Sequence, residues 1–239
     1  MIAGIAWRVG LALIAVLVVG LQIDRESERS PDVAALVPGP FRSSAQPIVT
    51  ADALADGHAA EALVNAQALL RRRPVPAEHL RLLAEAQIAV GKPAEAAQSI
   101  QYAAQRGWRD GTAQEAMMRL ALQAGDMPEA ARRYTALFLR NGSDDDALEQ
   151  VGRLVLSEPG GAGRTTFAAI IANSPRWHSR FLNRGAKVLP PDAFDEIFAF
   201  VSANGAQFDC SALGSARRKL ERRGADGAAA ISAVLERRC

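Results

Sequence analysis

The stretch Gly91-Lys92-Pro93-Ala94-Glu95-Ala96 has two counterparts in the same chain: Gly57-His58-Ala59-Ala60-Glu61-Ala62 and Gly125-Asp126-Met127-Pro128-Glu129-Ala130. Consecutive copies begin 34 residues apart, and each reads glycine, three variable residues, glutamate and alanine. A fixed period of this length is typical of stacked supersecondary units rather than of one globular core. The expected architecture therefore follows from this repeat.

The residues on either side of Gly91 predict two antiparallel helices. Apolar residues recur at helical spacing before the glycine: Leu80, Leu83, Ala84 and Ile88. Gly91 supplies the left-handed backbone that ends this helix, and Pro93 suits the first turn of the next, where no amide donor is needed. The second helix carries Ala96, Ile100 and Ala103 on one face. Such a pair leaves one apolar side open, which only a neighbouring pair can cover.

These units resemble the tetratricopeptide repeat (TPR) family, whose signature has a small residue after leucine in the first helix, alanine four residues before a bulky residue in the second, and a closing proline. The matching residues are Leu83-Ala84, Ala62 with Ala66, Ala96 with Ile100, Ala130 with Tyr134, and Pro74. The chain departs from the signature in lacking the early tryptophan, in Thr50 and Met118 at the small position, and in Trp108 for the second proline. The resemblance covers residues 43–144 and implies an all-α solenoid of stacked helix hairpins, a TPR-like superhelix.

Periodicity and capping residues extend the helical pattern over the rest of the chain. Helices are expected at about 46–56, 59–72, 77–90, 93–106, 111–124, 128–140, 146–157, 164–173, 177–188, 193–203, 211–222 and 227–237. Residues 145–176 form a degenerate fourth repeat, and residues 177–239 form a C-terminal helical cap. The cluster Asp144-Asp145-Asp146 stands where a helix begins, so it is interpreted as a cap and not as a metal site.

The amino terminus is expected to be a transmembrane helix, residues 1–23. Residues 9–23 carry no charge, and counting Ile2 to Trp7, with Arg8 reaching the interface, brings the segment to membrane thickness. A cleaved signal peptide is the alternative, although Val18-Val19-Gly20 fits a cleavage site poorly. Residues 24–42 are rich in proline, serine and charge, so a flexible linker is expected before Ser43 or Ser44 caps the first repeat helix.

Charges flanking this helix predict its orientation. Arg8 precedes it, whereas the acidic residues Asp24, Glu26 and Glu28 outnumber Arg25 and Arg29 after it. The positive-inside rule then places the bulk of the chain outside the cytoplasm. Because the bias toward alanine and arginine is typical of bacteria, the expected location is the inner membrane, with the repeats in the periplasm.

Motifs that resemble catalytic or ligand sites are weak. The loop Pro159-Gly160-Gly161-Ala162-Gly163-Arg164-Thr165 lacks the lysine and the preceding strand of a phosphate-binding loop. The histidines His58, His79 and His178 lie about 20 to 100 residues apart, without metal-ligand spacing. A net charge of +2 gives no nucleic-acid footprint. The sequence therefore predicts no catalytic residue, no cofactor, no metal and no nucleic-acid partner.

The TPR resemblance implies a concave groove, lined by the first helix of each unit, that receives a protein partner. The corresponding positions are Arg81, Glu85, Glu115 and Arg119, whose mixed charges suit a polar, extended segment. The expected function is a non-catalytic scaffold for protein–protein interaction, and membrane-anchored members of the family suggest envelope or exopolysaccharide assembly and export. The alternative is a periplasmic hydrolase that uses the region of Cys210 with His178.

The chain has two cysteines, Cys210 and Cys239, at the two ends of the last expected helix pair. Antiparallel helices of similar length return the chain to its starting level, so both sulfur atoms are expected at the same end of the pair. This placement predicts a disulfide with its Cα atoms about 5.5 Å apart. Such a bond persists in an oxidising compartment, in agreement with a periplasmic location.

Overall fold

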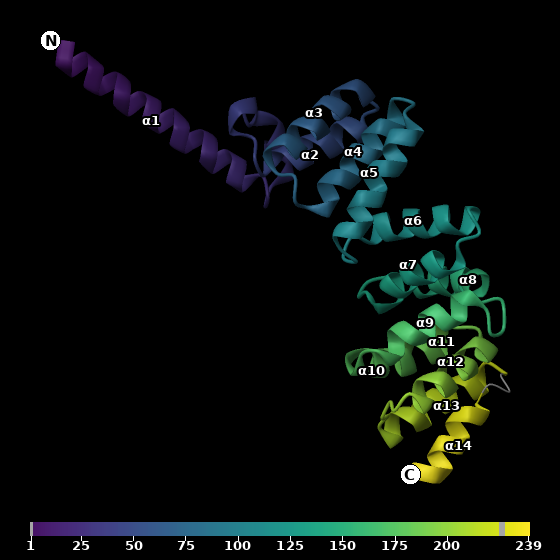
Figure 1. Cartoon of the computed structure of the whole chain (residues 1–239). Coiled ribbons are helices and arrows are strands. Elements are labelled where there is room, and N and C mark those ends of the chain that lie inside the picture. The colour runs from purple at the N-terminus through teal and green to yellow at the C-terminus, as the bar shows by residue number, and fades with distance from the viewer. Residues whose placement is uncertain (1, 225–227) are drawn as a thin grey trace. The chain divides into compact units, whose positions relative to one another are not determined.

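The computed structural model describes residues 2–224 and 228–239. These residues divide into two compact units, Met1–Gly107 and Trp108–Cys239, and each is described by itself. Every regular element in the described ranges is a helix (Figure 1). The all-α prediction is therefore confirmed, and the observed helix bounds fall within a few residues of those expected from periodicity.

The first unit begins with a long helix and continues as two helix hairpins. Its elements are α1 (Ile2–Glu26), η1 (Pro31–Leu36), η2 (Gly39–Phe41), α2 (Ala45–Ala55), α3 (Ala59–Arg72), α4 (Ala77–Ala89) and α5 (Pro93–Arg106). Helix α2 packs on α3 and α4 packs on α5, while α3 also packs on α4. The unit thus contains two successive hairpins that bury their apolar sides against each other.

The repeated glycines make the same turn at each copy of the motif. Gly57, Gly91 and Gly125 have φ of 76°, 77° and 72°, the left-handed region that an L side chain rarely adopts. The residue after each glycine donates a backbone hydrogen bond to the helix that the glycine ends. The N–H of His58 donates to the Ala53 carbonyl at 2.8 Å, that of Lys92 to the Gln87 carbonyl at 2.8 Å, and that of Asp126 to the Ala121 carbonyl at 2.9 Å. This is the Schellman arrangement expected of a glycine that ends a helix.

Small residues bring the helices of the first unit together. Ala62 and Ala66 are fully buried beside Ala53 and Ala86, and the predicted face of α5, Ala96, Ile100 and Ala103, is buried as expected. Ile88 is an exception, because 63% of its surface is exposed. The buried residues of α4 are His79, Leu80, Leu82, Ala84, Ala86 and Gln87. This arc is centred near Leu83, and Ile88 lies about 140° from Leu83 around the helix.

Helix α1 contains one segment, Gly4–Glu26, that is long and apolar enough to cross a membrane, and its side chains are almost all exposed. A signal sequence has the same properties, so that alternative stays open.

The segment expected to be a flexible linker is folded onto the first unit. Residues 31–36 and 39–41 form short 3-10 helices, and a small apolar cluster buries Ala34, Val37 and Ala45, with Ile23 of α1 packed against it. The serine caps expected for α2 are also absent, since Ser44 makes no side-chain bond to that helix. Instead, the Asp24 carboxylate accepts hydrogen bonds from the backbone N–H groups of Ser43, Ser44 and Ala45. These bonds connect the end of α1 to the start of α2.

The second unit is an assembly of helices around an aromatic core. Its elements are α6 (Gly111–Gln123), α7 (Met127–Leu139), α8 (Asp145–Val155), α9 (Ala162–Ala172), η3 (Pro175–Trp177), α10 (His178–Arg180), the π-helical turn η4 (Phe181–Gly185), α11 (Ala186–Val188), α12 (Pro191–Ala203), α13 (Cys210–Arg222) and α14 (Ala229–Arg238). Helices α6 and α7 form the third hairpin. The fully buried rings are Tyr134, Phe138, Phe167, Phe181, Phe194 and Phe198.

The segment expected to be a degenerate fourth repeat, residues 145–176, does not form a simple hairpin. The main neighbours of α9 are α7 and α12, whereas α8 packs on α7 and α11. Tyr134 of α7 packs closely on α8, because its hydroxyl donates to the Leu148 carbonyl and a Cβ atom at Gly152 would come within 2.6 Å of the hydroxyl oxygen. Gly152 therefore permits the close approach of α7 and α8.

The two cysteines are paired as predicted. Cys210 begins α13 and Cys239 follows α14, and their Cα atoms are 6.0 Å apart in a disulfide. The connection between these helices includes residues 225–227, which lie outside the described residues, as does the expected helix start at 227.

Candidate functional site

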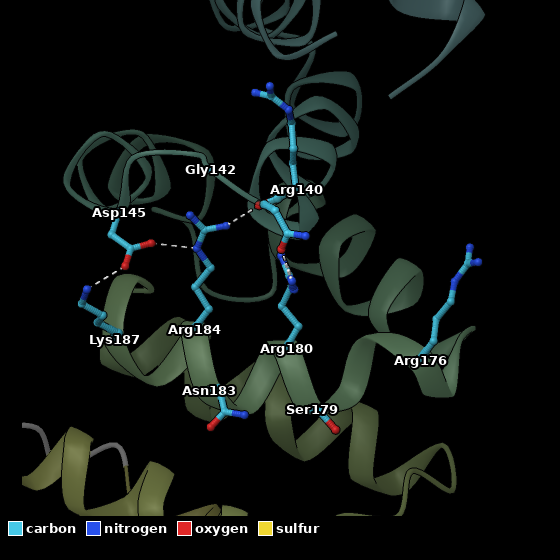
Figure 2. Close-up of a pocket in the computed structure, with 10 residues that line it drawn as sticks. Arg140, Gly142, Asp145, Arg176, Ser179, Arg180, Asn183, Arg184 and Lys187 are labelled. Atoms are coloured by element: carbon cyan, nitrogen blue, oxygen red, sulfur yellow. Dashed lines mark hydrogen bonds and ion pairs between the residues drawn. The ribbon is translucent and has the colours of Figure 1, made fainter. Parts of the chain in front are cut away.

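A cleft of about 620 Å³ with a cationic lining lies in the second unit (Figure 2). We call it the cationic cleft, and its lining residues are Arg140, Asn141, Gly142, Asp145, Arg176, Ser179, Arg180, Asn183, Arg184 and Lys187. Five of these residues are cationic and one, Asp145, is anionic. The Arg140 side chain points away from Arg180 and Arg184 and its guanidinium lies against Gly111, so the cationic groups of the cleft are those of Arg176, Arg180, Arg184 and Lys187 (Figure 2). Two segments supply the lining residues: the loop after α7, and the helical stretch from η3 to α11.

The spacing of the arginines places them on one side of the second segment. Arg176, Arg180 and Arg184 follow one another at intervals of four, so they share a helix face. The opposite face carries Phe181, Leu182 and Ala186, which are buried in the core of the unit. Burial of this apolar face fixes the rotation of the segment and turns Arg180 and Arg184 toward residues 140–145, with Arg176 farther along the same segment.

Arg184 binds the loop and the end of α7. Its guanidinium donates to the carbonyls of Phe138 at 2.8 Å and Arg140 at 2.9 Å, and to Asp145 Oδ1 at 2.8 Å. The last carbonyls of a helix have no partner within that helix and carry the negative end of its dipole, so a guanidinium is a suitable partner. Arg184 is therefore a structural member of the cleft, with most of its donors already in use.

Arg180 makes a second clamp on the same loop. It donates to the Leu139 carbonyl at 2.9 Å and to the side-chain oxygen of Asn141. Figure 2 shows Arg180 and Arg184 side by side, both reaching toward the loop. Because two arginines fix this loop, the wall of the cleft is ordered before any ligand arrives, which reduces the entropy cost of binding.

Asp145 balances part of the charge. Lys187 Nζ lies 2.6 Å from its Oδ2, and this hydrogen bond, with that from Arg184, holds the pKa of the Asp145 carboxyl below its usual value. The same contact raises the pKa of the exposed Lys187 ammonium. The carboxylate therefore stays ionised at neutral pH, and the cationic side chains of Arg176, Arg180, Arg184 and Lys187 leave the cleft a net excess of three positive charges.

Arg176 stands at the far end of the cleft (Figure 2). Its guanidinium lies 4.2 Å from the centre of the Trp177 ring, a cation–π contact, and Trp177 meets Trp108 edge to face with ring centres 6.3 Å apart. Arg176 is exposed and forms no ion pair within the described ranges. Its charge is thus available to an external anion, beside an aromatic surface.

The four residues expected to line a groove form two local ion pairs. Arg81 lies 2.5 Å from Glu85 on α4, and Arg119 lies 2.6 Å from Glu115 on α6. Each pair joins successive turns of one helix, and the two helices belong to different units. Glu115 also lines a separate cavity of about 240 Å³ beside Met118 and Tyr134. The proposed groove across the four residues stays a prediction.

The residues of the hydrolase alternative do not present a thiol nucleophile. Cys210 is bonded to Cys239, so no thiolate is available at that position in this form. His178 is buried beside the Phe208 ring and lines a cavity of about 370 Å³ that Asp209 also lines. Asp209 is the cap of α13, because it accepts the Ala212 N–H at 2.9 Å.

The glycine-rich loop is the start of a packed helix. Arg164 is 2% exposed, and its guanidinium binds Asp192, Glu196 and the Leu156 carbonyl. A Cβ atom at Gly163 would come within 2.0 Å of the Val155 carbonyl, so this glycine permits close packing of the chain. His79 is likewise structural, with Nδ1 2.8 Å from the Arg73 carbonyl. The described residues contain no group of His, Cys, Asp and Glu able to hold a metal ion.

Comparisons with protein-family models, with curated proteins and with solved structures give no match. The cationic cleft was missed by sequence reasoning. Its signal is the interval of four between Arg176, Arg180 and Arg184, which is visible in the sequence. The loop that completes the cleft lies about 40 residues earlier in the chain, so the sequence offers no local reason to join the two segments.

Proposed function

We propose that this protein is a membrane-anchored, non-catalytic scaffold of tetratricopeptide type that binds an acidic segment of a protein partner in its cationic cleft. The observation that carries the proposal is the lining itself, with the cationic side chains of Arg176, Arg180, Arg184 and Lys187 against one carboxylate. Guanidinium groups bind carboxylates with two parallel hydrogen bonds, which gives such contacts both strength and direction.

The shape and lining of the cleft favour a polypeptide segment as the ligand. Exposed Ser179 and Asn183 alternate with the arginines in the sequence of the lining segment and offer hydrogen-bonding groups to a backbone. The Trp177 ring beneath Arg176 and the Trp108 ring next to it offer aromatic surface beside the cleft, and aromatic residues are enriched at protein interfaces. In a segment with several carboxylates and an apolar residue, the carboxylates would bind the arginines and the apolar residue would pack on the tryptophan rings.

Helix α1 and the cysteines support the proposed location. A helix long enough to cross a membrane would hold the units at its surface, with the flanking charges favouring the periplasmic side of a bacterial inner membrane. The Cys210–Cys239 pair suits an oxidising compartment. Participation in envelope or exopolysaccharide assembly remains an analogy with membrane-anchored repeat proteins.

The test is the affinity of the full chain, in phosphatidylcholine nanodiscs, for a fluorescent decaglutamate peptide. We expect saturable binding that weakens with added salt, because the contacts are between exposed charges. Arg176→Glu should weaken binding by about fivefold or more, since it replaces an attraction of about 1 kcal/mol by a repulsion. Arg218→Glu is the control, because it makes the same change of charge at an exposed residue of α13 outside the cleft. It should change the affinity for the peptide little.

Two results would overturn the proposal. Equal weakening by Arg176→Glu and Arg218→Glu would mean that the peptide responds only to net charge. Absence of binding at low ionic strength would mean that the cleft does not recognise carboxylates.

A further inference from the structure

The end of α1 is in direct contact with residues 36–41, which we call the collar. Gly20 is buried against the Phe41 ring, so closely that a Cβ atom added there would come within 2.9 Å of it. One turn later, Ile23 packs against the cluster of Ala34, Val37 and Ala45. The Asp24 hydrogen bonds to residues 43–45 complete the attachment. The collar is therefore fixed at the level of residues 20–24 of the helix.

The length of the apolar stretch places this level at the edge of a bilayer. Residues 2–23, with Arg8 reaching the interface, span about 33 Å as a helix, close to the thickness of a hydrocarbon core, about 30 Å. When this stretch crosses the core, residues 20–24 lie at the boundary between hydrocarbon and headgroups. The collar packs against the helix at this level, so it is positioned to enter that region.

The composition of the collar suits a partly apolar medium. Leu36 is 72% exposed, and Pro38 and Pro40 have no backbone N–H that would require a partner. The Val37 carbonyl accepts from Arg42 Nε at 2.7 Å, and the Gly39 carbonyl accepts from Arg72 at 3.1 Å. The Pro38 carbonyl accepts from the Phe41 N–H at 2.9 Å. The carbonyls of Val37, Pro38 and Gly39, whose exposure to lipid would be costly, thus have partners within the protein.

Charged residues of both signs lie beside the collar. Arg25 and Arg29 are exposed just beyond the apolar stretch, where lipid phosphates would lie, and Arg29 lies 3.5 Å from Glu26. Long basic side chains commonly keep their charge among headgroups while their stems cover apolar surface.

We propose that the collar enters the lipid headgroup boundary beside α1, so that the first unit sits directly on the membrane rather than at the end of a tether. This inference rests on α1 crossing the membrane, as in the proposed function. The recognised surface is the bilayer itself, through the apolar groups of residues 36–41 and the flanking arginines.

The test measures the depth of single fluorescent labels in phosphatidylcholine vesicles that contain lipids with a nitroxide quencher near the headgroup. Labels are attached to the full chain at Gly39→Cys, Val16→Cys and Val64→Cys. Gly39 has open space at its Cβ position and no positive φ, Val16 is in the middle of α1, and Val64 is exposed on α3. Because Cys210 and Cys239 are paired, the unsubstituted chain gives the labelling background.

We expect several-fold stronger quenching at Gly39 than at Val64, with lipid contact at Val16 confirmed by a quencher placed deeper in the acyl chain. Quenching at Gly39 no stronger than at Val64, with Val16 in contact with lipid, would overturn the collar while leaving the membrane helix intact. A Val16 label without lipid contact would overturn both the helix and the collar. The three labels therefore separate failure of this inference from failure of the membrane anchor.

Discussion

Asp24 at the end of α1 and Ala45 at the start of α2 are joined by a hydrogen bond of 3.0 Å, from the Ala45 N–H to Asp24 Oδ1. The same carboxylate accepts the N–H groups of Ser43 at 2.8 Å and Ser44 at 3.0 Å. A side chain from another helix thus does what a local cap normally does, and satisfies donors that α2 cannot satisfy itself.

Removal of this carboxylate should destabilise the first unit. We expect Asp24→Ala to lower the free energy of unfolding by about 1–2 kcal/mol, the usual effect of losing a helix cap. Ser30→Ala is the matched control, because Ser30 precedes η1 without a side-chain capping bond, and its effect should be small. Chemical denaturation of the chain in detergent measures both, and equal losses would contradict the role given to Asp24.

The prediction of α2 illustrates what the sequence could and could not supply. Its bounds followed from apolar periodicity, which is local, whereas its cap lies about 20 residues away and depends on how the chain folds back. The proline-rich composition of residues 24–42 suggested a flexible linker for the same reason. Proline prevents long helices but permits short 3-10 turns, and nothing local shows that Val37 and Ala34 will be buried.

Short-range features were predicted well because single residues determine them. Gly91 ends α4 through its own backbone freedom, and Asp144 caps α8 through its own carboxylate, which accepts from the Asp146 N–H at 2.8 Å. The cationic cleft could not be predicted in this way, because it depends on the contact between Arg184 and Asp145. These residues are far apart in sequence, and only the packing of the second unit brings them together.

A substitution at a repeated glycine should be costly despite ample space. Gly91→Ala places a side chain at φ 77°, and although nothing lies within 4 Å of its Cβ position, the backbone strain should cost about 1–2 kcal/mol. Gly214→Ala is the contrasting variant, because Gly214 lies inside α13 with ordinary φ and should become more stable by about 0.5–1 kcal/mol. Thermal unfolding measures both, and a neutral Gly91→Ala would contradict the glycine turn.

The disulfide should stabilise the end of the second unit. Cys210 and Cys239 are 29 residues apart in sequence, and closing a loop of this size contributes about 3–4 kcal/mol on the chain-entropy estimate. Replacing both cysteines by serine should lower the unfolding free energy by about this amount. A thiol assay on denatured protein taken from the native compartment, with and without reductant, checks the bond. Full labelling without reductant would contradict it.

The ion pairs of Asp145 should make stability depend on pH in the acid range. Because the pKa of Asp145 is lower in the folded state, mainly through Lys187, its contribution is complete above the ordinary carboxyl pKa and is lost as the pH falls through the folded value. Asp145→Asn should lower stability by about 1 kcal/mol at pH 7 and converge with the unsubstituted protein at low pH. Asp146→Asn, which changes the adjacent charge, is the control. A difference from the unsubstituted protein that stays constant with pH would contradict this contribution.

The most direct test of the central claim is photo-crosslinking from inside the cationic cleft in native membranes. A benzophenone side chain at exposed Asn183 lies on the cleft lining, and one at exposed Val64 on α3 serves as the control. We predict one discrete protein adduct from position 183, with an acidic segment at the crosslinked site, whose yield falls when Arg176→Glu is added. No adduct from position 183, or a yield unaffected by Arg176→Glu, would contradict a scaffold that binds its partner through the cleft.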